Sequence, residues 1–267
     1  EYLNLQSGEN VIDATLDGGG HTKIFLETMA PNGKVLGIEQ DEGMVENIIS
    51  QKIKNLTVAQ DNFRNIKKIS EKINFQPNAV FFDLGMSTWH LKESGKGFSF
   101  QKPEEPLDMR FSKNAKATAA EILNSFTKEK LAEIFKEYGE EPKSRFFARR
   151  IVEQRKNKKI ITTEDFLKAL GVINPKILAR IFQSLRIYIN DEINALKEGL
   201  FGAFAILKRG GRIVVISYHS LEDREVKNFF KNIEKEGVGK TFKKPVVSGL
   251  DEIKRNPSAR SAKLRIL

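Results

Sequence analysis

The chain has 267 residues, and its 40% hydrophobic content with a mean hydropathy of -0.40 describes a soluble globular protein with ample apolar material for a core. It contains no cysteine and only three widely separated histidines, so disulfides, a thiolate nucleophile and a metal site are not expected. Lys and Arg number 45 against 35 Asp and Glu, and the resulting net charge of +10 favours a nucleic acid partner.

The first hundred residues alternate short apolar runs with helical apolar spacing. This alternation predicts a parallel sheet whose two faces are covered by helices. The strands are expected within residues 11–16, 35–38, 56–59 and 79–82.

A membrane span needs about 18 consecutive apolar residues. No stretch of the sequence approaches that length, so we expect a cytoplasmic protein without membrane contact.

A different pattern begins near Asp108, because the chain from there to Arg186 shows helical spacing without a convincing buried strand. A fifth strand is expected at 212–217, after a helix that we expect to end with Gly210 as its cap. The sequence therefore predicts one α/β domain, residues 1–107 and 187–267, interrupted by an inserted helical domain of residues 108–186.

Polar or glycine-rich segments follow the expected strands where each one ends. Gly18 to Gly20 follow the first strand, Glu39 ends the second, Phe63 follows the third and Asp83 ends the fourth. Parallel strands present these ends at one edge of the sheet, where open α/β folds bind ligands, and a carboxylate like Glu39 typically binds ribose hydroxyls. The pattern favours an adenosine cofactor: S-adenosylmethionine suits it at least as well as a nicotinamide, while the alternative is an ordinary loop with a solvated charge.

Several longer segments make the sequence recognisable. They occur in order along nearly the whole chain and include VIDATLDGGGHT, GKGFSFQKPEEPLDMRF, FQSLRIYINDEINAL and GGRIVVISYHSLEDREVK. The chain resembles the bacterial 16S ribosomal RNA cytosine-N4 methyltransferases, the family also called RsmH or MraW. The resemblance implies a class I, Rossmann-like, S-adenosylmethionine-dependent methyltransferase domain with an inserted all-helical domain. It also implies methyl transfer to the N4 amine of one cytidine in the decoding region of 16S ribosomal RNA, with the small ribosomal subunit as partner.

The resemblance also implies a set of cofactor-binding residues, which are Gly19, Gly20, His21, Glu39, Phe63, Asp83 and His90. This sequence departs from the family at three of its positions. Asp17 stands where the family has glycine, although aspartate tolerates a left-handed backbone better than most residues. Glu39 replaces an aspartate, and His90 replaces a glutamine. The family's N-terminal His-x-Pro-Val-Leu pattern does not occur before Glu1.

Asp83 is the candidate catalytic residue, chosen for its position at the end of the fourth strand. We expect direct in-line methyl transfer, in which positioning and electrostatics supply most of the acceleration. Because the chain has no cysteine, covalent attack on the cytosine ring at C5 is unavailable. Two alternatives remain: a methyltransferase of the same fold with another nucleic acid target, and a non-catalytic RNA-binding or ribosome-assembly factor that retained the cofactor pocket.

The candidate RNA-binding residues are one aromatic residue and the basic residues of two segments. Trp89 is expected to stack on a base, whereas core packing is favoured for Phe98. Basic segments are usually solvated, but the charge and the resemblance favour phosphate contacts. The basic candidates are Arg155, Lys156, Lys158 and Lys159 within 143–159, and Arg260 and Lys263 near the C-terminus.

The segment after the fifth strand, from Tyr218 to Ser220, has two interpretations. Its side chains contact the base or cofactor, or they cap the next helix. Ser220 with Asp223 resembles a capping box, so capping is favoured for Ser220, while the role of His219 stays open. The sequence indicates no oligomeric state.

Overall fold

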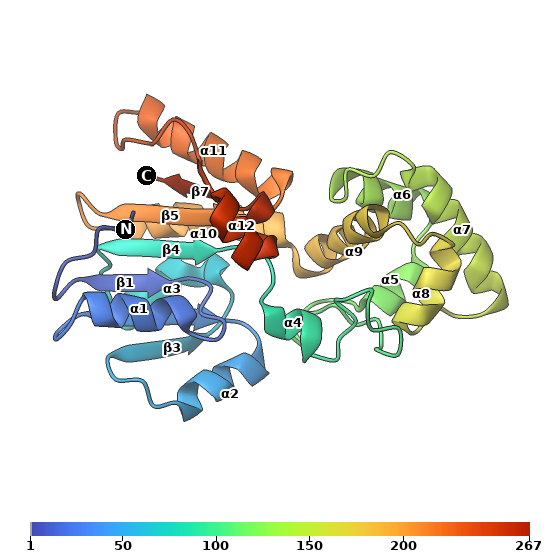
Figure 1. Cartoon of the computed structure of the whole chain (residues 1–267), viewed down its shortest axis with the longest axis horizontal. Helices are drawn as coiled ribbons and strands as arrows, with labels where there is room; N and C mark the ends of the chain where they lie inside the picture. The colour runs from blue at the N-terminus through green and yellow to red at the C-terminus, as the bar shows by residue number, and fades with distance from the viewer. Residues whose placement is uncertain (1) are drawn as a thin grey trace. The chain divides into compact units, whose positions relative to one another are not determined.

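The computed structural model describes residues 2–267 and divides into two compact units (Figure 1). The first comprises Glu1–Gly85 with Ile193–Leu267, and the second comprises Met86–Glu192. The boundaries differ from the expected ones because residues 86–107 and 187–192 belong to the second unit. Phe98, Leu107 and Ile189 are buried in its helical core, which explains this difference.

The first unit is built on one seven-stranded sheet with the order β3-β2-β1-β4-β5-β7-β6. Strands β1 to β5 are parallel, β7 is antiparallel to β5, and β6 is antiparallel to β7. The bounds are β1 Asn10–Asp13, β2 Lys34–Glu39, β3 Leu56–Gln60, β4 Ala79–Asp83, β5 Arg212–Ser217, β6 Val246–Val247 and β7 Lys263–Ile266. The five expected strands are confirmed. The last two are not in the sequence prediction, because Val246–Val247 is too short and Lys263–Ile266 too basic to read as buried.

Helices cover both faces of this sheet, because successive strand residues point to opposite faces. Ile12 and Phe82 pack with α3, α10 and α11 on one face, whereas Val11 and Phe81 pack with α1 on the other. The helices of this unit are α1 Gly20–Thr28, α2 Glu42–Ser50, α3 Ile66–Lys72, α10 Glu192–Ile206, α11 Ser220–Lys235 and α12 Leu250–Arg255, with short 3-10 turns at Phe63–Asn65 and Pro257–Ser261.

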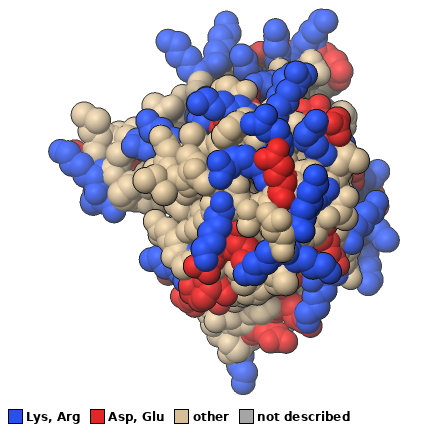
Figure 2. Space-filling model, turned by 90° about the vertical axis from the view of Figure 1, so that its right-hand side faces the viewer, with Lys and Arg blue, Asp and Glu red and all other residues tan. Residues whose placement is uncertain are grey.

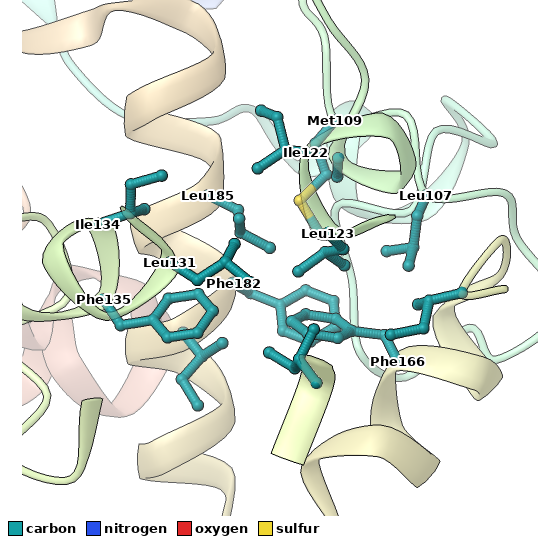
Figure 3. Packing of buried hydrophobic residues seen from close by; sticks show 14 of the residues in the cluster. Leu107, Met109, Ile122, Leu123, Leu131, Ile134, Phe135, Phe166, Phe182 and Leu185 are labelled. Atoms are coloured by element: carbon teal, nitrogen blue, oxygen red, sulfur yellow. The ribbon is translucent and has the colours of Figure 1, made fainter. Parts of the chain in front are cut away.

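The second unit is helical, and its core is shown in Figure 3. Phe135 and Phe166 are completely buried there, and Phe98 is also buried, as its expected core role requires. The helices are α4 Thr88–Lys92, α5 Ala119–Ser125, α6 Lys128–Glu137, α7 Ser144–Asn157, α8 Thr163–Leu170 and α9 Pro175–Asn190.

Two helix ends differ from the expected caps. The N-cap of α11 is His219 rather than Ser220, and its capping-box partner is Glu222. Imidazole accepts the backbone N–H of Glu222 as a hydroxyl would, so the box lies one residue earlier than the serine pattern indicates. Gly210 has the expected positive φ of 78°, but it lies in the turn before β5, beyond the end of α10 at Ile206.

Candidate functional site

The carboxyl ends of β1 and β4 define the edge of the sheet at which a ligand can bind. From β1 the chain proceeds outward through β2 and β3, and it then returns to add β4 and β5 on the other side. Connections that leave in opposite directions open a crevice at the carboxyl ends of the two central strands. Asp13 ends β1 and Asp83 ends β4, so both carboxylates lie at this crevice.

The glycine-rich loop between β1 and α1 leaves the start of α1 open. Gly19 is the N-cap with a φ of 74°, no side chain caps the helix, and its first turn has no acidic residue. A Cβ on Gly19 would lie 2.9 Å from the Ile48 side chain, so only glycine fits there without displacement. Gly18 and Gly20 face open space. A helix start of this kind offers backbone N–H groups and a positive partial charge to an anionic group.

Glu39 ties the glycine-rich loop to the end of β2. One carboxylate oxygen accepts the N–H groups of Gln40 and Asp41 at 2.8 Å each, and the other accepts that of Asp17 at 3.1 Å. Burial raises the pKa of Glu39, although these hydrogen bonds oppose the shift. A carboxylate has about four acceptor positions, so this side chain shapes the loop and retains capacity for a further donor.

Three carboxyl groups near the crevice, those of Asp13, Asp17 and Glu39, have raised pKa values. Burial raises the pKa of Asp13 to about 7, even though Thr22 donates a hydroxyl hydrogen bond to it at 2.7 Å. Burial also raises the pKa of Asp17 to about 8, with repulsion from Glu39 next in importance. As expected, Asp17 adopts a left-handed backbone, with a φ of 44°. A cationic ligand would relieve this repulsion, so the arrangement is complementary to positive charge.

Asp83 is held by side chains from two other elements. The Tyr218 hydroxyl donates to Oδ1 at 2.9 Å, and His21 Nε2 lies 3.2 Å from Oδ2. The hydrogen bond to Asp83 raises the pKa of His21, and burial together with Asp83 raises that of Tyr218. Tyr218 follows β5, His21 comes shortly after β1, and Asp83 itself ends β4. Side chains from the ends of three strands therefore meet at this carboxylate.

Phe63 lies at the end of β3, where the sequence places it in the cofactor set. Its ring contacts Phe82 edge-on at 5.6 Å, and a Cβ on Gly199 would approach it to 2.8 Å. Asn62 caps this turn and also donates from Nδ2 to Gln40 at 2.9 Å. Phe63 and Asn62 therefore follow β3 at the edge of the sheet where Glu39 ends β2, and Asn62 is hydrogen-bonded to the residue after Glu39.

His90 and Trp89 belong to the second unit, in α4. His90 is buried, and its ring makes edge-on contacts with Phe98 and Phe111, which stack on each other; its Nδ1 lies 2.8 Å from the Ser87 hydroxyl. Trp89 is half-buried and contacts His90 edge-on. Their predicted roles in cofactor and RNA binding remain predictions.

The predicted basic residues fall into two groups. Arg155 donates to the Leu123 carbonyl at 2.7 Å, Lys158 pairs with Asp165 at 2.7 Å, and Lys263 pairs with Asp223 at 3.0 Å. The ion pair with Lys158 holds the pKa of Asp165 at about 2. Lys158 is nevertheless exposed, as are Lys156, Lys159 and Arg260. Figure 2 shows lysine and arginine side chains over much of the face drawn there, with acidic side chains in smaller clusters.

Comparison with known protein families identifies the chain as a whole. The model of the MraW methylase family matches residues 1–267. The chain belongs to the MraW methylase family. Its α/β fold is therefore the Rossmann-like methyltransferase fold that the sequence predicts, and its cofactor is S-adenosyl-L-methionine.

Individual proteins are similar over almost the whole chain. A Dictyoglomus thermophilum protein named ribosomal RNA small subunit methyltransferase H is 44% identical, covering 99% of this chain and 92% of its own. Its namesake from Persephonella marina is 39% identical, covering 99% and 94%. Among solved structures, fibrillarin from Aeropyrum pernix has a TM-score of 0.43 at 9% identity, covering 98% of this chain and 66% of its own. Within residues 2–267, no helix is both long and apolar enough to cross a membrane.

Proposed function

We propose that this MraW-family chain transfers a methyl group from S-adenosylmethionine to the N4 amine of a cytidine in the decoding region of 16S ribosomal RNA. The observation that carries the proposal is the match, over 99% of the chain, to relatives named ribosomal RNA small subunit methyltransferase H. The Asp83 network supplies the chemistry. The partner is the small ribosomal subunit, and the compartment that follows is the cytoplasm.

The residues at the strand ends fit this cofactor. The uncapped start of α1 at Gly19 and Gly20 suits the carboxylate of its methionine part, and Glu39 suits the ribose hydroxyls. Phe63 and Asn62 suit the face and edge of the adenine. Asp13 and Asp17, whose pKa values are raised, would be stabilised in their ionised forms by a sulfonium or ammonium charge.

Asp83 is the residue proposed to act on the base. The bound cofactor supplies a methyl group on a positively charged sulfur. With that methyl group transferred, the cofactor would leave as a neutral thioether. The amine that receives the methyl group would become cationic and would release one proton to the solvent. The Asp83 carboxylate, oriented by Tyr218 and His21, would accept a hydrogen bond from that amine and stabilise its developing charge.

The surrounding chain restricts the chemistry and provides the RNA contacts. None of the 267 residues is cysteine, so the reaction proposed is a direct transfer without a covalent bond to the base. The helical unit is proposed to bind RNA. Trp89 would stack on a base, and exposed Lys156 and Lys159 would contact phosphates. In the first unit, exposed Arg260 would contact a phosphate as well.

The experiment is methylation of small subunits that lack the modification, followed by mass spectrometry of the nucleosides and mapping of the methylated position. Asp83→Asn keeps the shape of the side chain and removes its charge, so turnover at saturating cofactor should fall about a hundredfold to ten-thousandfold. Asp251→Asn in α12, where the side chain is exposed, is the matched control for net charge. A methyl group found on another atom or another RNA would refute the substrate, and a fully active Asp83→Asn variant would refute the role of this carboxylate.

A further inference from the structure

The helical unit carries a second feature that the cofactor site does not use. A groove of about 1130 Å³ runs between α6 and α7. Phe146 from the first turn of α7 lies in it, and this side chain is 43% exposed. The groove is lined by Lys128, Glu129, Ala132, Glu133, Lys136, Glu137, Pro142, Lys143, Ser144, Arg145, Phe146 and Arg149.

The ring of Phe146 is held firmly in place. It contacts the buried Phe147 edge-on at 5.3 Å. The guanidinium groups of Arg149 and Arg150 lie 5.9 and 5.8 Å from its centre. Arg150 is anchored, because its Nε donates to the Ala169 carbonyl at 3.1 Å. The ring is held by packing against Phe147 and by two guanidinium groups that lie over it, so its exposed part loses little freedom on binding.

The charges around this ring favour an anionic partner. The groove has five lysine or arginine side chains and three glutamates among its lining residues. Two of the glutamates already face lysines, since Glu129 lies 3.3 Å from Lys128 and Glu133 lies 2.7 Å from Lys130. On the α7 side, the first helical turn contains no acidic residue. Arg149, whose side chain is 60% exposed, lies 3.8 Å from the exposed Glu153 one turn further along the helix. The α7 side of the groove is therefore positive.

Few of the residues that line the groove are apolar. Of the lining residues only Ala132, Pro142 and Phe146 are apolar. Protein interfaces place several buried apolar or aromatic anchors at their centre, whereas single-stranded nucleic acid needs one ring for a base and cations for the backbone. One exposed ring with cations near it matches what single-stranded nucleic acid requires.

We propose that this groove is a binding site for single-stranded RNA, in which one base stacks on Phe146 and the adjacent phosphates contact Lys143, Arg145 and Arg149. This inference rests on the proposed function for the identity of the polymer. It adds an RNA contact at the N-terminal end of α7 to the one proposed for Lys156 and Lys159 at its C-terminal end, where Arg155 and Lys158 already have partners within the unit.

The test is binding of the full chain to a fluorescein-labelled oligoadenylate of about 12 nucleotides, a length within the usual range for such sites. Phe146→Ala should weaken binding about fivefold to a hundredfold, because stacking on the base is lost, and should leave the salt dependence unchanged. Phe146→Trp should bind as the unmodified chain does. Arg149→Ser should weaken binding and reduce the slope of log affinity against log salt by about 0.7. Phe201→Ala, at a phenylalanine that is 67% exposed in the other unit, is the matched control.

Three outcomes would overturn the inference: Phe146→Ala binding within twofold of the unmodified chain, Phe201→Ala causing an equal loss, or no binding by the unmodified chain. Calorimetry with S-adenosylmethionine and the circular dichroism of each variant verify that it is folded. An unmodified chain that binds the oligoadenylate through Phe146 but does not methylate small subunits would refute the proposed function and leave this site standing.

Discussion

Asp17 offers a direct test of the idea that the carboxylates near the ends of the strands bind a cationic ligand. Because its pKa is raised to about 8, Asp17 is protonated and neutral at pH 6 when the cofactor is absent. Asp17→Asn imitates that neutral form at every pH and keeps a residue that tolerates the φ of 44°. The variant and the unmodified chain should therefore bind S-adenosylmethionine alike at pH 6 and differ as the pH rises through 8.

The size of the difference in S-adenosylmethionine affinity follows from how far the bound cation lowers the pKa of Asp17. Each pKa unit corresponds to about 1.4 kcal/mol, or about tenfold in affinity. A shift of one to two units would make the unmodified chain about tenfold to a hundredfold tighter than Asp17→Asn at pH 8.5. The binding should also release protons near pH 7, because ionisation of the carboxyl accompanies it.

The assay is isothermal titration calorimetry at pH 6, 7 and 8.5, in two buffers of different ionisation enthalpy. The α-amino group of the cofactor titrates near pH 8 itself, but it does so equally with both proteins, so their ratio isolates Asp17. Asp251→Asn controls for the change in net charge. Equal affinities of Asp17→Asn and the unmodified chain at pH 8.5 would refute the reasoning.

The same raised pKa has a consequence for the cofactor-free protein. A carboxyl whose pKa is higher in the folded state contributes stability below its ordinary pKa of 3.8, and that contribution is lost as the pH rises through 8. Thermal unfolding of Asp17→Asn should thus occur at a higher temperature than that of the unmodified chain at pH 8.5. The two should unfold alike at pH 3.

Two further predictions concern the Asp83 network and the helical core. Tyr218→Phe removes the donor to Asp83, so single-turnover methylation should slow about tenfold to a hundredfold with little change in cofactor affinity, and an unchanged rate would show that this hydrogen bond does not orient the carboxylate. Phe135→Ala, at a completely buried ring in the second unit, should lower the free energy of unfolding by about 3–5 kcal/mol in urea denaturation. A loss below about 1 kcal/mol would mean that the surrounding side chains refill the space.

The sequence by itself determined the features that depend on neighbours along the chain. Each of β1 to β5 is a short apolar run between turn residues, and the glycine-rich loop is recognisable because glycine, as at Gly19, adopts the left-handed backbone that such a turn requires. The strand-end positions of Glu39 and Asp83 follow from the same local pattern. Family membership followed from motifs such as GFSF and SYHSLEDR, which are also local.

Tertiary structure alone decided which of these residues meet. Tyr218 donates a hydrogen bond to Asp83, which lies 135 residues away in the sequence. Lys263 and Arg265 of β7 form ion pairs with Asp223 of α11, so their charges are neutralised within the fold, although the composition counts them toward the net charge. The basic β7 belongs to the sheet because antiparallel pairing with β5 satisfies its backbone, a gain that no local pattern reveals. Side-chain type and spacing encode local conformation, whereas the contacts that orient a carboxylate or neutralise a lysine depend on long-range packing, which becomes fixed only when distant segments fold against one another.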